Sequence, residues 1–208
     1  MLELNKIYCG DCLEVMKEIP DKSIDLVLTD FPYGINCEYD GYEDTQENLK
    51  YLVDNAMPEI LRISKRALIT CGVLNIQLYP KYDWSLCWVS SAGAGSGPWG
   101  FCCWQPILAY GKDPYLQNGK GRRPDIIESN EQSNKNLKHS CPKPLNFWKK
   151  LLLRGSVFEG DVVCDPMNGS GTTTEVCKIL NRKFVGIDQS QKYCDIAEKR
   201  LQQETIFN

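Results

Sequence analysis

Short apolar runs alternate along this chain with longer stretches in which apolar residues recur every three or four positions. Short runs bounded by turn residues are typical of buried strands, and the longer period is typical of amphipathic helices. We predict seven strands, at 6–9, 23–30, 67–71, 84–89, 106–110, 162–165 and 183–187. Strands that alternate with helical segments indicate an α/β fold, here one mostly parallel sheet with helices on both faces.

The most regular helical pattern spans residues 45–64, where apolar positions follow the 3.6-residue period. They are Leu49, Leu52, Val53, Ala56, Met57, Ile60 and Leu61. A shorter helix is predicted between Asp11 and Pro20, and another over 144–154, ended by Gly155. The last helix carries Tyr193, Ile196, Ala197 and Leu201 on one face.

A cluster of polar and aromatic residues, Thr29 to Gly34, follows the second predicted strand directly. Open α/β folds bind ligands where their strands end, so this cluster is a candidate active site. The Asp30 carboxylate and the Pro32 carbonyl are pure acceptors, suited to the two N–H groups of an exocyclic amine, and the Tyr33 ring offers a face for stacking a base. A plain strand-to-loop turn is the alternative for this segment by itself. The polar loop 36–44 could close over the site.

A second candidate site follows the sixth strand. Asp165 ends this strand, a glycine-containing turn over 166–174 leads into a helix, and the next strand ends at Asp188, 23 residues later. This arrangement is typical of a Rossmann half-site in which the second acid binds ribose hydroxyls. Thr174 stands where a third glycine would fall, which disfavours a dinucleotide. Asp165 would repel phosphate and suits an ammonium group, such as that of S-adenosylmethionine (SAM).

Taken in order, these motifs resemble the β-class DNA amino-methyltransferases, in which an Asp-Pro-Pro-Tyr box precedes the cofactor turn. The resemblance covers nearly the whole chain and implies a SAM methyltransferase fold in which the box Asp30, Phe31, Pro32 and Tyr33 is catalytic. The implied cofactor-binding residues are Asp11, Cys12, Asp30, His139, Ser140, Lys143, Asp165, Pro166, Asn168, Gly169, Ser170, Gly171, Thr172, Thr173 and Asp188. Two residues depart from the pattern: Phe31 replaces a proline that stiffens the loop, and Met167 replaces an aromatic residue.

The reaction that the resemblance implies is transfer of a methyl group from SAM to N6 of a flipped-out adenine in DNA, as in restriction-modification systems. The acid at position 30 favours adenine, because the cytosine-N4 enzymes of the family more often carry serine there. A cytosine-N4, an RNA or a protein amide methyltransferase is the nearest alternative. A catalytically silent DNA-binding subunit is another, suggested by Phe31, and a dehydrogenase is a third, disfavoured by the missing glycine.

The charge of the chain is unevenly distributed. Residues 1–63 hold 5 basic and 14 acidic residues, whereas 112–154 hold 10 basic and 4 acidic. We therefore expect DNA phosphates to contact Lys120, Arg122 and Arg123. The expected organisation is one methyltransferase domain over 1–208, with a small target-recognition region at about 90–138. So small a recognition region predicts a short DNA target sequence, and a second copy of the chain, in a homodimer, could assist recognition.

The remaining composition is that of an ordinary globular chain. No signal-like N-terminus and no apolar run long enough for a membrane span is present, so we expect a cytoplasmic protein. Eleven cysteines, an odd number, indicate free buried thiols. Cys9 and Cys12 with Cys102 and Cys103 could supply four thiolates, but a second Cys-x-x-Cys is missing and His139 is the one histidine, so we expect no metal site.

Overall fold

The computed structural model describes residues 2–91, 95–132 and 142–203. Its centre is an eight-stranded sheet in the order β1-β12-β11-β2-β5-β9-β6-β10. In that order the strands are Lys6–Cys9, Lys183–Asp188, Val162–Asp165, Leu26–Asp30, Ala67–Thr70, Trp104–Tyr110, Trp84–Val89 and Ile126–Glu128. All neighbours are parallel except β9, which is antiparallel to both β5 and β6. The predicted α/β fold with a mostly parallel sheet is therefore confirmed.

The predicted sheet of seven strands is one strand short. The seven predicted strands are all present, and β10 adds an eighth in a polar stretch for which the sequence predicts no regular structure. This strand has three residues, of which only Ile127 is buried. So short a run has no measurable alternation, and its place in the sheet depends on pairing with β6.

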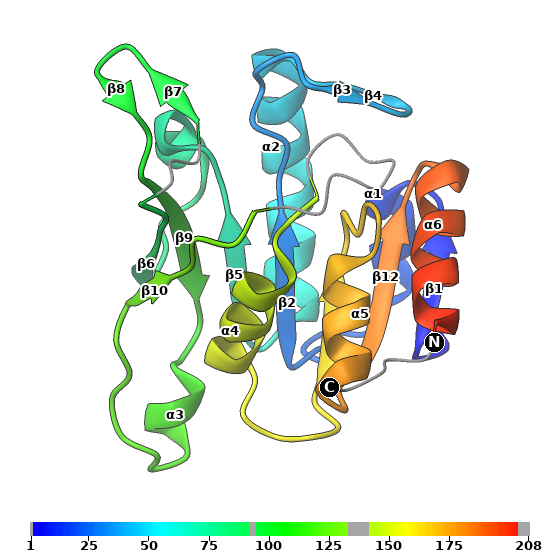
Figure 1. Cartoon of the computed structure of the whole chain (residues 1–208). Helices are drawn as coiled ribbons and strands as arrows, with labels where there is room; N and C mark the ends of the chain where they lie inside the picture. The colour runs from blue at the N-terminus through cyan, green and yellow to red at the C-terminus, as the bar shows by residue number, and fades with distance from the viewer. Residues whose placement is uncertain (1, 92–94, 133–141, 204–208) are drawn as a thin grey trace.

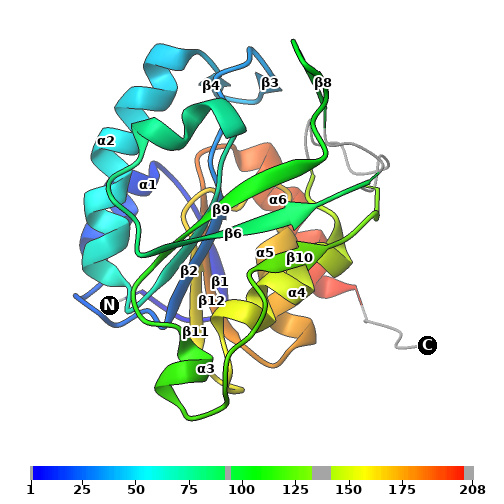
Figure 2. The same cartoon turned by 90° about the vertical axis from the view of Figure 1, so that its left-hand side faces the viewer.

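Helices cover both faces of the sheet, as Figure 2 shows. The short α1 (Cys12–Val15), a 3-10 turn over Met16–Glu18, α2 (Gln46–Ile63) and a 3-10 segment (Val73–Leu78) pack on one face. On the other face lie α4 (Leu145–Gly155), α5 (Thr172–Ile179) and α6 (Gln191–Gln202). Each face of the sheet has its own hydrophobic core, and side chains of β2 alternate between the two cores. Val27 packs in the core beneath α2, whereas Leu26 and Leu28 pack in the core beneath α4.

The boundaries of α2 agree with the sequence prediction. Thr45 caps the helix by accepting a hydrogen bond from the Asn48 N–H at 3.1 Å, and Ser64 is its last flanking residue. The helix α4 ends at Gly155 as predicted, and Gly155 is its last helical residue, without a left-handed backbone. A β-carbon at Gly155 would lie 2.8 Å from the side chains of Leu26 and Leu68. Glycine is needed there because the helix end approaches the sheet closely.

Two small hairpins and one helical turn complete the described chain. The predicted loop 36–44 contains β3 (Glu38–Tyr39) paired with β4 (Tyr42–Glu43), and the glycine-rich loop after β6 contains β7 (Ser96–Gly97) paired with β8 (Gly100–Phe101). Both hairpins lie at the carboxyl edge of the sheet, the edge at which β2, β11 and β12 end (Figure 1). The turn α3 (Pro114–Gln117) lies at the opposite, amino edge. Within the described ranges, no helix is long and apolar enough to span a bilayer.

Candidate active site at the carboxyl edge of the sheet

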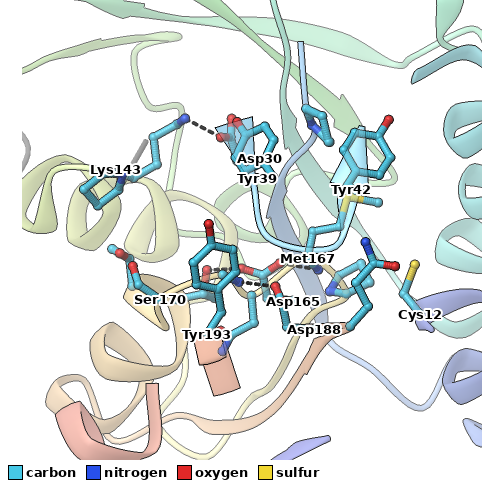
Figure 3. Close-up of a pocket in the computed structure, with 18 of the residues that line it drawn as sticks. Cys12, Asp30, Tyr39, Tyr42, Lys143, Asp165, Met167, Ser170, Asp188 and Tyr193 are labelled. Atoms are coloured by element: carbon cyan, nitrogen blue, oxygen red, sulfur yellow. Dashed lines mark hydrogen bonds and ion pairs between the residues drawn. The ribbon is translucent and has the colours of Figure 1, made fainter. Parts of the chain in front are cut away.

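A pocket of about 160 Å³ opens where β2 and β11 end side by side (Figure 3). From β2 the chain continues to β5 on one side of the sheet, and from β11 to β12 on the other, so the pocket lies at a topological switch point. The predicted residues that line it are Asp11, Cys12, Asp30, Pro32, Lys143, Asp165, Pro166, Asn168, Gly169, Ser170, Thr172, Thr173 and Asp188. Segments far apart in the sequence therefore meet in one pocket.

Asp30 is held by three side chains at the pocket wall. Oδ1 accepts a hydrogen bond from the Thr70 hydroxyl and lies 3.0 Å from the Tyr33 hydroxyl. Oδ2 forms an ion pair with the Lys143 ammonium, which also lies 5.2 Å from the centre of the Tyr33 ring. Burial first, and then the charge of Asp30, raise the pKa of Tyr33 well above its ordinary value, so the phenol is neutral and can donate. Only Oδ2 is left for a substrate, once Lys143 withdraws.

The other members of the box point in different directions. Pro32 lines the pocket, and within the described residues its carbonyl accepts no hydrogen bond, which leaves an acceptor near Asp30. Tyr33 is not a lining residue; its hydroxyl lies 3.0 Å from Gln105 on β9. Phe31 is fully buried on the opposite side and packs edge-on against Tyr79 at 5.4 Å. The chain is extended here, so side chains alternate and Phe31 is a core residue that does not reach the pocket.

The loop after the box is fixed by a buried carboxylate that the sequence analysis does not identify. Asp44 is 2% exposed and accepts hydrogen bonds from the backbone N–H groups of Gly34 (2.6 Å), Ile35 (3.2 Å) and Cys37 (3.0 Å). Gly34 has a φ of +65°, which favours glycine. These backbone N–H groups form a concave anion site occupied by the chain's own carboxylate.

Two amides hold the same loop from its other side. The Gln46 side chain donates to the carbonyls of Tyr33 (3.1 Å) and Gly34 (2.9 Å), and the Asn75 side chain donates to the Tyr33 carbonyl at 2.7 Å. Neither residue shows a sequence signal, because each acts only through a fold that brings α2 and the segment after β5 next to the box. Together with Asp44 they fix the backbone of the loop that follows the box.

Asp165 is buried at the floor of the pocket in a network of hydroxyls. Its carboxylate accepts hydrogen bonds from Thr29 at 2.6 Å, from the Met167 N–H at 3.0 Å and from Thr173, whose own oxygen accepts from the Trp148 indole at 2.7 Å. Burial raises the pKa of Asp165 to about 6, against the lowering effect of these donors. Near neutral pH the group is a carboxylate facing a pocket, suited to a cation.

Asp188 ends β12 on the same pocket and binds the glycine turn. It accepts hydrogen bonds from the N–H groups of Gly169 (2.8 Å) and Ser190 (2.9 Å), while burial raises its pKa. Each oxygen keeps a further lone pair for a ligand hydroxyl. Gly171 is not a lining residue; its φ is +84°, and a β-carbon there would lie 2.6 Å from Ala197. Gly171 therefore shapes the turn and allows α6 to pack beneath it.

Asn168 gives independent evidence that the pocket binds a ligand. Its side-chain nitrogen and oxygen are both buried, both lack a hydrogen-bond partner among the described residues, and the residue lines the pocket. Buried amides are normally paired, so an unpaired donor and acceptor in a pocket wall indicate a ligand that carries both kinds of group. An adenosine ribose with a methionyl amine and carboxylate offers these groups, and the residues present therefore fit SAM.

Further lining residues come from two helix starts and a hairpin. Asp11 caps α1 by accepting from the Leu13 N–H at 2.9 Å, and burial raises the pKa of the Cys12 thiol to about 12, so Cys12 is neutral. The β3–β4 hairpin leans over the pocket with Tyr39, Asp40 and Tyr42. It is tied to the start of α6 by a hydrogen bond from Ser190 to Asp40. The sequence suggests this segment as a cover but marks none of these three residues as a ligand contact.

Several predicted residues lie elsewhere. His139 and Ser140 fall outside the described residues. Lys120, Arg122 and Arg123 follow α3, the turn at the amino edge; the Lys120 ammonium lies 5.6 Å from the Phe158 ring and the Arg123 guanidinium lies 4.8 Å from the Tyr115 ring. None of the three lines the pocket, so any DNA phosphates that they contact would lie away from the target base.

Comparisons with known proteins establish the family. The model of the N6/N4 methyltransferase family, described as DNA methylase, matches residues 88–199, which is more than half of the chain. This chain belongs to the N6/N4 DNA methylase family. The cofactor of this family is SAM, and the pocket residues fit SAM. The methyl acceptor is an exocyclic amine of a DNA base.

Two relatives match over nearly all of the chain. The type II methyltransferase M.HpaI of Haemophilus parainfluenzae is 28% identical over 238 residues, which include 96% of this chain and 74% of that protein. M.BamHI of Bacillus amyloliquefaciens is 31% identical over 251 residues, with 96% and 57% covered, so this chain spans a little over half of M.BamHI.

Solved structures share the fold. The PvuII DNA methyltransferase (cytosine-N4-specific) superposes with a TM-score of 0.73 at 15% identity, covering 97% of this chain and 88% of that one. The DNA modification methylase TTHA0409 of Thermus thermophilus, in complex with SAM, superposes with a TM-score of 0.67 at 23% identity, covering 97% and 95%.

Proposed function

We propose that this DNA methylase is an adenine-N6 methyltransferase and that Asp30, Pro32 and Tyr33 hold the target base. The observation that carries the proposal is a pair of acceptors at the end of β2: the Pro32 carbonyl, which accepts no hydrogen bond from the described residues, and Asp30 Oδ2, which becomes free once Lys143 leaves it. An aspartate at position 30 favours adenine over cytosine, since serine is the commoner residue in the cytosine-N4 enzymes that this chain resembles.

The cofactor site of the proposal is the second half of the pocket. Asp188 and the Asn168 amide would hold the ribose and methionyl groups, and Asp165 would face the ammonium. Asp11 and Cys12 would contact the adenine moiety, as the family resemblance implies. When bound, SAM supplies an electrophilic methyl group on a sulfonium.

Asp30 and the Pro32 carbonyl would act on the base amine itself. Its nitrogen lone pair is delocalised into the ring, and accepting both N–H bonds draws the nitrogen toward tetrahedral geometry and frees the pair. After methylation the nitrogen must lose one proton, which the Asp30 side chain that accepts its hydrogen bond would take up. No covalent bond to the protein is required, so positioning supplies most of the rate.

Lys143 is predicted from the sequence to contact the cofactor, and its observed place gives it another role in the proposal. The ammonium lies against Asp30 Oδ2 and near the face of Tyr33, the two features that a flipped base would use. Base entry therefore requires displacement of this lysine. Until then, the ion pair keeps the carboxylate oriented and shielded from water.

The decisive experiment incubates the chain with radiolabelled SAM and mixed DNA, digests the DNA and identifies the labelled nucleoside. We expect N6-methyladenine. Label in N4-methylcytosine would replace adenine by cytosine as the target. Specific DNA binding without any labelled product, from a protein that binds SAM, would make the chain a silent subunit.

Target recognition is proposed to lie within residues 90–138, as one part of a single domain. In this region the β7–β8 hairpin stands at the same edge as the pocket and exposes all of Trp99 and most of Phe101. The segment 95–104 has no charged residue, so its contribution would be stacking or insertion between bases. Phosphate contacts must come from other parts of the carboxyl edge.

A further inference from the structure

A second cavity, of about 620 Å³, lies at the amino edge of the sheet, away from the methylation site. Its floor is the sheet surface at the first residues of β5 and β6 and the last residues of β9, and its walls are the segment 111–125 and the C-terminal end of α4. In Figure 1 this is the end at which α3 lies, opposite the two hairpins. Its volume is within the range of small-molecule sites.

Positive charge exceeds negative charge in the lining. Five cationic residues, Arg66, Lys112, Arg122, Arg123 and Arg154, face three carboxylates. Each carboxylate already has partners in the protein. Asp83 accepts from the Gly111 N–H at 2.7 Å, Asp125 from the Trp84 indole at 3.3 Å, and Asp113 caps α3 and pairs with Arg154.

The guanidinium groups, by contrast, have donors to spare. Arg66 donates only at the limit of hydrogen bonding, to the Gly155 carbonyl at 3.4 Å and the Gln117 side chain at 3.3 Å. The Nε atoms of Arg66 and Arg154 are buried without a hydrogen-bond partner among the described residues. Arg122 and Arg123 are exposed at the rim. Such a group of arginines suits a ligand with several anionic oxygens, because their planar forks match phosphate.

The floor between these cations is apolar. Ala67, Leu68, Leu86 and Ala109 supply a flat sheet surface, and Trp84 stands beside it with most of its ring exposed. The Trp84 hydrogen bond to Asp125 fixes the edge of the ring and leaves its face free. A flat aromatic group would fit against this surface, and aromatic rings stack favourably on tryptophan.

We propose that this amino-edge cavity is a binding site for a nucleoside polyphosphate, with the phosphates on Arg66, Arg122 and Arg123 and the base against Trp84 and the apolar floor. The ligand class follows from the combination of an arginine-rich rim with a flat apolar floor. The site is separate from the SAM pocket, so both can be occupied together.

The test measures binding of ATP by calorimetry and by thermal shift, at low salt and with saturating SAM to fill the carboxyl-edge pocket. We expect ATP to bind and to raise the melting temperature. Arg122→Ala with Arg123→Ala should weaken binding at least tenfold while methylation continues. Ala109→Phe should block the floor and abolish binding with every charge retained.

A matched control removes two exposed lysines far from the cavity, Lys17 in the 3-10 turn after α1 and Lys50 in α2. The variant Lys17→Ala with Lys50→Ala should bind ATP as wild type does. Adenosine and tripolyphosphate should each bind at least tenfold more weakly than ATP. Tripolyphosphate as tight as ATP would reduce the cavity to a plain anion site and overturn the proposal. So would loss of ATP binding on addition of SAM, unchanged binding in the Arg122/Arg123 or Ala109→Phe variants, or displacement of ATP by duplex DNA.

Discussion

The two edges of the sheet differ in how their charges are arranged. At the carboxyl edge, the acids Asp30, Asp165 and Asp188 are each held by donors of the protein around a pocket of about 160 Å³. At the amino edge, five cationic residues outnumber three carboxylates around a cavity of about 620 Å³, and two of the arginines have a buried Nε without a partner among the described residues. One edge is built to bind a cationic cofactor and the amine of a base, and the other to bind an anion.

The fold also separates the basic residues of one stretch of sequence between the two edges. Residues 112–154 carry the excess of positive charge, yet the chain passes from the amino edge through β10 and α4 within that stretch. Lys112 and Arg122 line the amino-edge cavity, whereas Lys143 pairs with Asp30 in the carboxyl-edge pocket. A count of charge along the chain merges sites that the fold places at opposite ends.

The largest expected effect is a loss of methyl transfer, without a loss of SAM binding, when Asp30 at the carboxyl edge is replaced. Asp30→Ala removes the acceptor for the base amine and should lower kcat by about 10³-fold, in the range expected when a positioned acid or base is removed. SAM should still bind, with a dissociation constant within about threefold of wild type. Single-turnover methylation and calorimetry measure the two. Unchanged turnover would remove Asp30 from the mechanism.

A smaller effect is expected from the residue that positions the catalytic loop. Asp44→Ala leaves three backbone N–H groups without an acceptor, so the box should shift and kcat should fall by about 10²-fold. SAM affinity should change little, because Asp44 is not a lining residue of the pocket. Asp44→Asn keeps one acceptor oxygen and should recover part of kcat, and Asp54→Ala, an exposed acid on α2, is the control. A loss of SAM affinity equal to the loss of kcat would indicate general unfolding.

Two double variants, one in the β7–β8 hairpin and one at the amino edge, compare the contributions of the two edges to DNA binding. Trp99→Ala with Phe101→Ala should weaken DNA binding by about tenfold or more, since each stacked ring contributes roughly 1–3 kcal/mol. Arg122→Ala with Arg123→Ala should leave DNA affinity within about twofold and its salt dependence unchanged. Fluorescence anisotropy over a salt series measures both. The opposite pattern would place the docking surface at the amino edge.

A change of pH should alter cofactor binding at the carboxyl edge. The pKa of Asp165 is raised to about 6, and an ammonium is bound by the carboxylate form, so SAM affinity should fall as pH falls through about 6, by up to about tenfold per unit below it. The same raised pKa means that ionising Asp165 costs folding stability, which declines from its ordinary pKa up to about 6 and then levels off. Asp165→Asn should bind weakly at every pH with no slope near 6, measured by calorimetry. A slope that persists would assign the titration to another group.

Sequence periodicity and motif order were sufficient for the fold and for most of the pocket. Parallel strands run in the same direction, so their carboxyl ends lie at the same edge of the sheet. Three predicted strands each end in an acid, which was enough to predict that Asp30, Asp165 and Asp188 lie close together. The helix over 45–64 was equally predictable, because its period and its Thr45 cap are local signals. In these cases, the determinant of the structure lies within a few residues of the feature.

Only the tertiary structure decided which side chains hold the catalytic loop and where the basic residues lie. Asp44 acts through backbone groups up to ten residues earlier, and Asn75 comes from beyond β5, so neither leaves a local pattern. In the sequence, Phe31 replaces a proline of the catalytic box that the chain resembles. In the structure it is a core residue, because the alternation of side chains turns it away from the pocket. Lys143, Arg122 and Arg123 are close in sequence but separated in space, since the chain crosses from the amino to the carboxyl edge of the sheet between them. The sequence gives the order of the charged residues along the chain, but the path of the backbone determines which of them lie close together in space.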